Sequence, residues 1–251
     1  SHLRGDFRTA CELLFEAMTI DPQAVDLRGV IRAAREIENW EALDQLLSMQ
    51  LHHTNSVKKK QALLRAQAQS RLTRGLHVPA YLALVGVLSL GSSSETEAEL
   101  NQLLEESRAA QDIEAWLLRD EVEYENTGWT QEILAYRRHL SRHEAEGGAH
   151  DAVSFLTKAL HRAPLSWEVA QALLEELDAR DRMEDWVHQV LTANTTRWPI
   201  ETRVPMIDRA IEYCRRTRST FLPATLRKKA QWIADNYADP EELFQLWRAY
   251  L

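Results

Sequence analysis

The stretch that decides the fold is residues 5–22, GDFRTACELLFEAMTIDP. Read as a helix, it puts small and apolar side chains on one stripe at spacings of three and four, namely Phe7, Ala10, Cys11, Leu14, Ala17 and Met18. Gly5 and Asp6 indicate a turn before this helix. Pro22 predicts its end, because a proline disfavours helical geometry in the residue before it. The small alanines would let a second helix approach closely, so the stretch predicts a helix packed against other helices.

The same pattern returns as GGAHDAVSFLTKALHRAP at residues 147–164. Ala10 and Ala152 are 142 positions apart, as are Pro22 and Pro164, and this distance is about four repeats of 35 residues. Between and beyond the two copies, apolar or turn-proximal anchors of each expected second helix recur at steps of 33 to 37 residues, namely Phe7, Trp40, His77, Ile113, Ala149 and Met183. Two copies in one register predict an array of helices paired as antiparallel hairpins.

Both copies resemble the second helix of the tetratricopeptide repeat (TPR), where a glycine and an aromatic residue precede a small alanine, a large apolar residue and a closing proline. In the first copy the matching residues are Gly5, Phe7, Ala10, Leu14, Ala17, Met18 and Pro22. In the second they are Gly147, Ala152, Leu156, Ala159, Leu160 and Pro164. The resemblance implies an all-α fold, an α-solenoid of antiparallel TPR-like helix hairpins coiled as a right-handed superhelix.

We expect three segments along the chain. Residues 1–4 are read as a tag remnant or linker, because Ser1-His2 resembles the end of a purification tag. Residues 5–195 carry the TPR-like repeats, and residues 196–251 form degenerate repeats or a C-terminal helical end-piece. The pattern enters at a second helix and ends within a helical one, so we expect a piece of a longer array. A cap at Ser94 or Thr96 is expected to start one first helix.

Composition narrows the classes of partner. The formal net charge is −8, and no apolar run approaches the 18 residues that a membrane span needs. Residues 56–74 hold six basic and no acidic side chains, residues 95–126 eleven acidic and two basic, and residues 203–229 eight basic and two acidic. An acidic block between two basic ones argues against a continuous nucleic-acid surface, which needs one basic face. The blocks suit a protein partner, contacts between neighbouring repeats, or simply solvated helix faces.

In a TPR, first-helix residues that do not face the core line the concave surface, so these give the candidate partner-binding residues. The first group is basic: Arg28, Arg32 and Arg35. Their alternative role is pairing within the chain to Glu36, Glu38 or Glu41. The second group is mixed, with Asn101, Glu105 and Arg108 beside a core of Leu100, Leu103, Leu104 and Ser107. The third is acidic, with Glu168, Gln171, Glu175 and Asp178 beside a core of Ala170, Leu173, Leu174 and Leu177.

Motifs that carry chemistry are missing from the sequence. No glycine-rich phosphate loop, Ser-His-Asp order or CxxC pair occurs, so we predict no catalytic residue and no cofactor. His139 and His143, with Glu146 nearby, form the best metal candidate, but no third ligand is fixed and we predict no metal site. Cys11, Trp116 and Trp186 are expected in the core, whereas Trp129 and Trp198 lie beside turns and are expected to be exposed.

These observations favour a non-catalytic scaffold that holds another protein on its concave surface, without nucleic acid and without inserting into a membrane. The degenerate, tryptophan-rich repeats are similar to the periplasmic TPR scaffolds of bacterial exopolysaccharide export systems of the Pel type. That resemblance implies a polysaccharide-modifying enzyme as the partner and the bacterial periplasm as the compartment. The alternatives are a helical-repeat enzyme of the α/α-toroid type, and a cytoplasmic TPR regulator or assembly factor.

Overall fold

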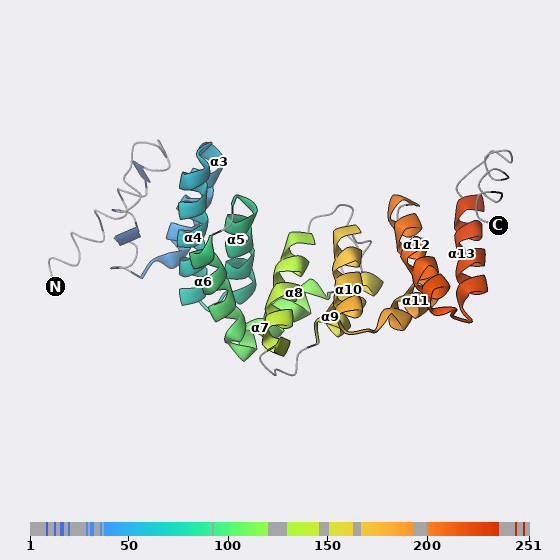
Figure 1. Ribbon diagram of the computed structural model, residues 1–251. Coiled ribbons are helices and arrows are strands. Elements are labelled where there is room, and N and C mark those ends of the chain that lie inside the picture. Colours follow the sequence, from blue (N-terminus) through green and yellow to red (C-terminus); the bar gives the residue numbers. More distant parts are fainter. Residues whose placement is uncertain are drawn as a thin grey trace. The chain divides into compact units, whose positions relative to one another are not determined.

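The computed structural model describes residues 38–91, 93–119, 130–145, 151–162, 167–192 and 200–235, together with single positions elsewhere. These ranges are helical, and no strand occurs within them, which confirms the all-α prediction for the described part of the chain (Figure 1). The helices there are α3 (Trp40–His53), α4 (Val57–Thr73), α5 (His77–Ser89), α6 (Ser94–Glu105), α7 (Ser107–Leu117), α8 (Thr130–Ala145), α9 (Ala152–Arg162), α10 (Trp167–Ala179), α11 (Met183–Thr192), α12 (Ile200–Thr217) and α13 (Leu222–Ala234).

Side-chain caps fix where several helices begin. Asn39 accepts a hydrogen bond from the amide of Ala42 at the start of α3, and Ser56 accepts one from Lys59 at the start of α4. These bonds satisfy backbone donors that have no partner inside the helix. The cap of α6 is Ser93, whose side chain accepts a hydrogen bond from the amide of Thr96 at 3.4 Å. The prediction of a cap at Ser94 or Thr96 was therefore wrong, since the cap lies one residue before Ser94.

One kind of turn closes α4, α10 and α12. Gly75, Asp181 and Arg218 follow these helices with positive φ angles of 69°, 54° and 54°. At each turn the amide of the next residue donates to the carbonyl five positions back at 2.8–2.9 Å, the bond of a Schellman motif. Only Gly75 takes this backbone conformation without steric strain. The motif leads directly into the helix that follows, so α4–α5, α10–α11 and α12–α13 are joined by short connections.

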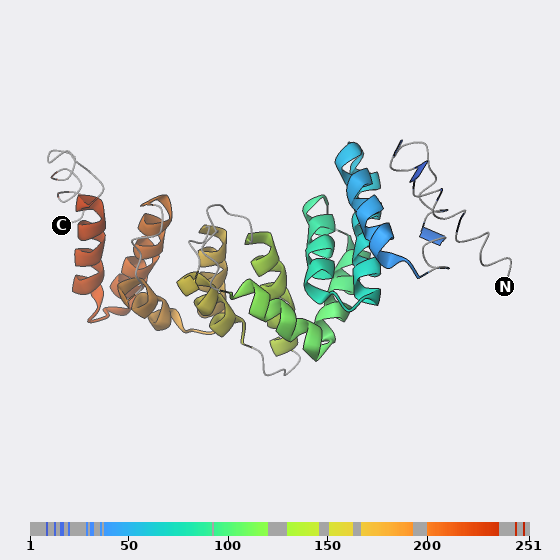
Figure 2. The ribbon, with the colours of Figure 1, turned by 180° about the vertical axis from the view of Figure 1, so that it is seen from behind.

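Contacts between helices are local in the chain. The chain forms two compact units, Ser1–Leu117 and Leu118–Leu251. In the first unit α4 packs on α3 and α5, and α5 also contacts α6 and α7; Figures 1 and 2 show α3, α4 and α5 side by side from both directions. In the second unit α9 packs between α8 and α10, and α12 contacts α11 and α13. The substantial contacts among the described helices therefore join elements one or two places apart.

The core of the first unit is built around α5. Ala80, Tyr81, Leu84 and Val87 are buried there, and α5 is apolar almost all round because α4, α6 and α7 surround it. Leu43, Leu46, Leu47 and Leu63 form a second cluster between α3 and α4. The apolar run at residues 82–90 is thus a buried helix. Among the described residues, none of the helices has both the length and the apolar character that crossing a bilayer requires.

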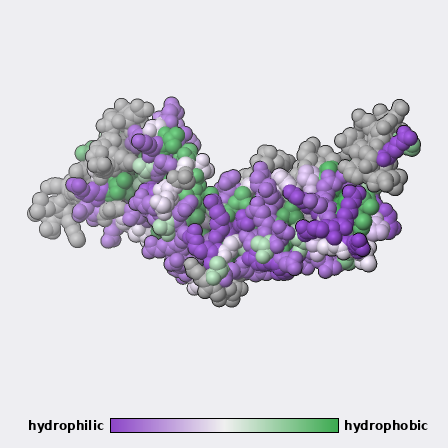
Figure 3. Space-filling view, in the orientation of Figure 1, coloured by the Kyte–Doolittle hydropathy of each residue, from purple (hydrophilic) through white to green (hydrophobic). Residues whose placement is uncertain are grey.

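The second unit is packed around aromatic side chains. Trp186 is fully buried, as predicted, and its indole Nε1 donates a hydrogen bond to the carbonyl of Met206 at 3.0 Å, which joins α11 to α12. The rings of Tyr136 and Phe155 lie 4.8 Å apart between α8 and α9. On the face drawn in Figure 3, hydrophilic side chains cover most of the described surface, and hydrophobic ones reach it only in small separate patches.

Some of the predicted anchor residues begin helices and others do not. The anchors Trp40, His77 and Met183 are the first residues of α3, α5 and α11, and Ala152 is fully buried as predicted. Ile113 is buried but lies inside α7. Ala10, Cys11, Ala149, Trp129 and Trp198 lie outside the described residues.

Three core predictions in the first unit were wrong, and the first concerns Ala17, which was expected on the packed stripe of residues 5–22 but is exposed. The sequence was read as one helix through Ser107 and Arg108, but α6 ends at Glu105, and Glu106 has extended backbone angles of −73° and 109°. Ser107 therefore begins α7 and is exposed instead of belonging to the core of α6. Trp116, expected in the core, is only partly buried on α7.

Candidate functional site

Helix α10 separates cleanly into a buried and an exposed face. Its buried face holds the four core residues that the sequence predicts, Ala170, Leu173, Leu174 and Leu177. Its exposed face holds the four predicted partner-binding residues, Glu168, Gln171, Glu175 and Asp178. The 3.6-residue period of a helix produces this division, because positions three, four and seven apart share a face.

A cavity of about 440 Å³ lies between α10 and α12, and we call it the α10–α12 cavity. Three of the four predicted residues on α10 line it, and Glu168 does not. Its full lining is Trp167, Gln171, Leu174, Glu175, Asp178, Met183, Arg209, Glu212, Tyr213 and Arg216. The sequence thus identified one wall of a cavity whose other wall lies more than 30 residues further along the chain.

The wall on α12 is charged and aromatic, and the sequence analysis did not single it out. Arg209 and Glu212 form an exposed ion pair at 3.1 Å, and the guanidinium carbon of Arg216 lies 5.8 Å from the centre of the Tyr213 ring. The signal available in the sequence was the basic block at residues 203–229. That block could not show which of its side chains face α10. The cavity therefore has carboxylates on its α10 wall, and two guanidinium groups and the carboxylate of Glu212 on its α12 wall.

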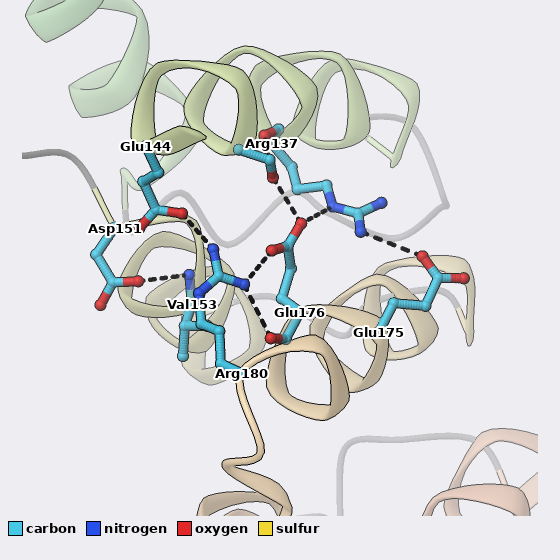
Figure 4. A network of polar contacts seen from close by, with 8 residues as sticks. Arg137, Glu144, Asp151, Val153, Glu175, Glu176 and Arg180 are labelled. Carbon is cyan, nitrogen blue, oxygen red and sulfur yellow. Dashed lines mark hydrogen bonds and ion pairs between the residues drawn. The ribbon is translucent and has the colours of Figure 1, made fainter. Parts of the chain in front are cut away.

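A network of charged side chains joins α8 to α10 beside this cavity (Figure 4). Glu176 is its centre: its carboxylate accepts from Arg137 Nε and from Ser141 Oγ, both at 2.6 Å, and from Arg180. Arg180 also donates to Glu144 of α8. Only 7% of the Glu176 side chain is exposed, so this is a buried carboxylate that accepts hydrogen bonds from two arginines and one serine. Such groups are stable in a protein interior only when they are paired and hydrogen-bonded.

Glu175 belongs to both the network and the cavity. Arg137 Nη2 donates to Glu175 at 3.2 Å, while the same carboxylate lines the α10–α12 cavity. Glu175, which the sequence predicts as a partner-binding residue, therefore already has one ion-pair partner within the chain.

Burial and hydrogen bonding oppose each other at Glu176. Burial alone would raise the pKa of this carboxyl, but the hydrogen bonds from Ser141, Arg180 and Arg137 and the charge of Arg137 bring its pKa below the ordinary value of 4.5. Glu176 is therefore ionised at neutral pH and helps to hold α8 and α10 together.

The predicted partner-binding residues of the first unit do not share one helix face as those of α10 do. Arg32 is exposed, and Arg28 and Arg35 lie outside the described residues. Asn101 is partly buried and Glu105 is exposed on α6. Arg108 is exposed but belongs to α7, so the prediction that it shares the inner face of one helix with Asn101 and Glu105 was wrong.

A second cavity, of about 610 Å³, lies between α4 and α6 with its floor on α5, and we call it the α4–α6 groove. Glu99 and Gln102 of α6, and Glu106 directly after it, line one wall, and none of them was among the predicted site residues. Asn101 and Glu105 are outside this lining. The full set is Arg65, Ala66, Ala68, Gln69, Leu72, His77, Leu84, Glu99, Gln102, Leu103 and Glu106.

Two arginines of the basic block at residues 56–74 form ion pairs with carboxylates of the same chain. Arg65 donates to Glu95 at 2.5 Å, to Ser93 at 2.8 Å and to Thr96 at 2.6 and 3.0 Å. Arg71 donates to Asp44 of α3 at 3.0 Å. Arg65 thus connects the basic block at residues 56–74 to the acidic block at residues 95–126. Contacts within the chain were one of the roles that the sequence suggested for these blocks.

Among the residues considered for metal or thiol chemistry, His139 and Cys214 are buried and His143 is partly buried. His139 is buried on α8 with its ring 6.0 Å from that of His143, and Glu146 lies outside the described residues. Within the described ranges, no group of three His, Cys, Asp or Glu side chains is placed to hold a metal ion. Cys214 is a buried free cysteine, and burial raises the pKa of its thiol.

Comparisons of the chain with protein-family models, with curated proteins and with solved structures found no match.

Proposed function

We propose that this chain is a non-catalytic protein-binding scaffold, an α-solenoid of antiparallel TPR-like helix hairpins that coil as a right-handed superhelix. Three features support the solenoid. Helices start at the repeat anchors Trp40, His77 and Met183, Schellman turns close α4, α10 and α12, and the substantial helix contacts join close neighbours in the chain. A repeat array depends on contacts of this local kind.

The observation that carries the proposed binding function is the two-sided charge of the α10–α12 cavity. One wall holds Glu175 and Asp178, and the other holds Arg216 and the Arg209–Glu212 ion pair. Trp167 and Tyr213 supply aromatic surfaces. Protein interfaces combine aromatic anchors with paired charges in this way. A partner protein that presents basic and acidic side chains on a short segment would pair with both walls.

The likeness to exopolysaccharide export scaffolds extends this proposal. On that reading the partner is a polysaccharide-modifying enzyme, and the scaffold works in the bacterial periplasm. The stripe of Arg28, Arg32 and Arg35 would add a basic contact to the same partner.

The experiment replaces Gln171 or Glu168 by a photo-crosslinking residue and exposes the whole chain to an extract of its native cells. We expect one partner protein to be joined through position 171 and not through position 168, which is exposed on the same helix but does not line the cavity. Equal yields from both positions would overturn the location, and turnover of a polysaccharide or ester that depends on this chain would overturn the non-catalytic role.

The identified partner is then titrated by calorimetry. Asp178→Lys should weaken its binding about tenfold, since each exposed ion pair contributes about 0–1 kcal/mol and a reversal adds repulsion. Glu168→Lys is the matched control and should change the dissociation constant less than about twofold. Binding should also fall with added salt.

A further inference from the structure

The α4–α6 groove has an apolar floor. Ala68, Leu84 and Leu103 are buried beneath it, from α4, α5 and α6 respectively. Leu72 stands at its edge with 38% of its surface exposed. The small side chains Ala66 and Ala68 leave the space that a partner's side chain could fill. Apolar surface at the edge of a cavity gains free energy when another apolar group covers it.

The charges of the groove do not balance. Arg65 is the only arginine or lysine in the described lining, and its guanidinium is already held by Glu95, Ser93 and Thr96 outside the groove. Its distance to Glu99 is 3.9 Å, at the limit of an ion pair.

The other possible cation in the lining is His77, whose Nδ1 lies 2.9 Å from Asp112 and is thus already paired with a carboxylate. Glu99 and Glu106 therefore give the groove a negative wall next to the exposed Leu72.

We propose that the α4–α6 groove binds a polypeptide segment in which an apolar side chain is flanked by lysine or arginine. The apolar side chain would enter above Leu84 and Leu103, and the flanking cations would pair with Glu99 and Glu106. A nucleic acid is disfavoured because its phosphates would meet this negative wall. The inference rests on the proposed role in binding protein and adds a second contact surface of different chemistry in the other compact unit.

The probes are three fluorescein-labelled peptides of equal length: leucines flanked by lysines, leucines flanked by glutamates, and glycines flanked by lysines. Fluorescence anisotropy with the whole chain measures their binding at low and moderate salt. We expect the leucine–lysine peptide to bind at least about fivefold more tightly than either of the others, because only it satisfies both the floor and the wall. Equal binding of the glycine–lysine peptide would reduce the site to nonspecific charge attraction and overturn the proposal.

Variants of α6 then locate the site. Glu99→Lys with Glu106→Lys should weaken the leucine–lysine peptide about tenfold or more, and Glu99→Gln with Glu106→Gln should weaken it less but in the same direction. Glu105→Lys is the control, since it makes the same charge change as each single reversal, at an exposed position of α6 outside the lining. Leu72→Ser should weaken the peptide without changing its salt dependence. A loss with Glu105→Lys equal to that of the double reversal would refute the groove.

Asp178→Lys separates this inference from the proposed function. It lies in the α10–α12 cavity of the other compact unit and should leave peptide binding unchanged. If the peptide fails to bind while partner capture still depends on Asp178, only the groove assignment falls. If the peptide binds and partner capture fails, the groove assignment survives and the proposed site on α10 falls.

Discussion

Replacing Glu176 by glutamine tests whether the network between α8 and α10 stabilises the second unit. The substitution keeps the size of the side chain and removes its charge. Arg137 and Arg180 then lose their shared carboxylate while 20% and 27% of their side chains are exposed. Each keeps one other carboxylate, Glu175 for Arg137 and Glu144 for Arg180.

The expected cost follows from this geometry. Removing one member of a fully buried ion pair costs about 3–5 kcal/mol. Because both arginines are partly solvated and each retains a partner, we expect a smaller loss of about 2–3 kcal/mol in the free energy of unfolding. For a unit of this size such a loss lowers Tm by roughly 5–12 °C. Glu175→Gln removes only the exposed contact to Arg137 and should cost about 0–1 kcal/mol.

Calorimetric unfolding of the whole chain measures the loss, and hydrogen exchange of the α8 and α10 amides shows where it occurs. Faster exchange should be confined to the second unit. A shift for Glu176→Gln no larger than that for Glu175→Gln would refute the idea that the buried carboxylate organises this packing.

The pH dependence has a definite sign. The pKa of Glu176 is lowered in the folded chain, so its stabilising contribution is complete above the ordinary value of 4.5 and is lost as the pH falls through the lower folded pKa. The difference in stability between the original chain and Glu176→Gln should therefore be constant near neutral pH and shrink below about 4.5. A difference that grows with acidification would contradict this assignment.

Four further substitutions test packing, a turn and an ion pair. Ala152→Leu should overpack α9 and cost about 1–3 kcal/mol, and an unchanged Tm would show that the register of this repeat is wrong. Arg218→Gly should stabilise the chain by about 1 kcal/mol, because its positive φ strains any residue with a Cβ; chemical denaturation measures the gain, and a loss would contradict it. Asp208→Asn should cost about 1–3 kcal/mol because it leaves Lys229, which is only 2% exposed, without this carboxylate. Lys229→Met should change stability by less than about 1 kcal/mol, because an apolar side chain can fill the buried position. A larger loss of thermal stability for Lys229→Met than for Asp208→Asn would refute this interpretation of the ion pair.

Much of the helical pattern could be predicted from the sequence. The buried and exposed faces of α10 follow from the apolar residues at positions 170, 173, 174 and 177, because their spacing matches the 3.6-residue period of a helix. The start of α11 at Met183 coincides with one of the anchor positions that the sequence predicts. These features depend on residues close together in the chain, so local patterns carry the information.

The features that could not be predicted from the sequence depend on residues far apart in the chain, or on backbone conformations that no glycine or proline signals. Glu176 looks like one more surface glutamate until Arg137, 39 positions away, is placed beside it. The end of α6 at Glu106 has neither glycine nor proline to mark it. Asp181 and Arg218 adopt a turn for which glycine is the usual signal. The α12 wall of the cavity could not be assigned, because spacing alone does not show which face of α12 meets α10.

The local contacts between helices also bear on how the chain folds while it is synthesised. Each described helix finds most of its packing surface on elements one or two places away, so little of the chain must be made before a newly formed helix can be covered. Low sequence separation of contacts favours rapid folding. We therefore expect neighbouring helices to pack one after another as they leave the ribosome, with apolar faces such as that of α5 exposed only until the next helix emerges.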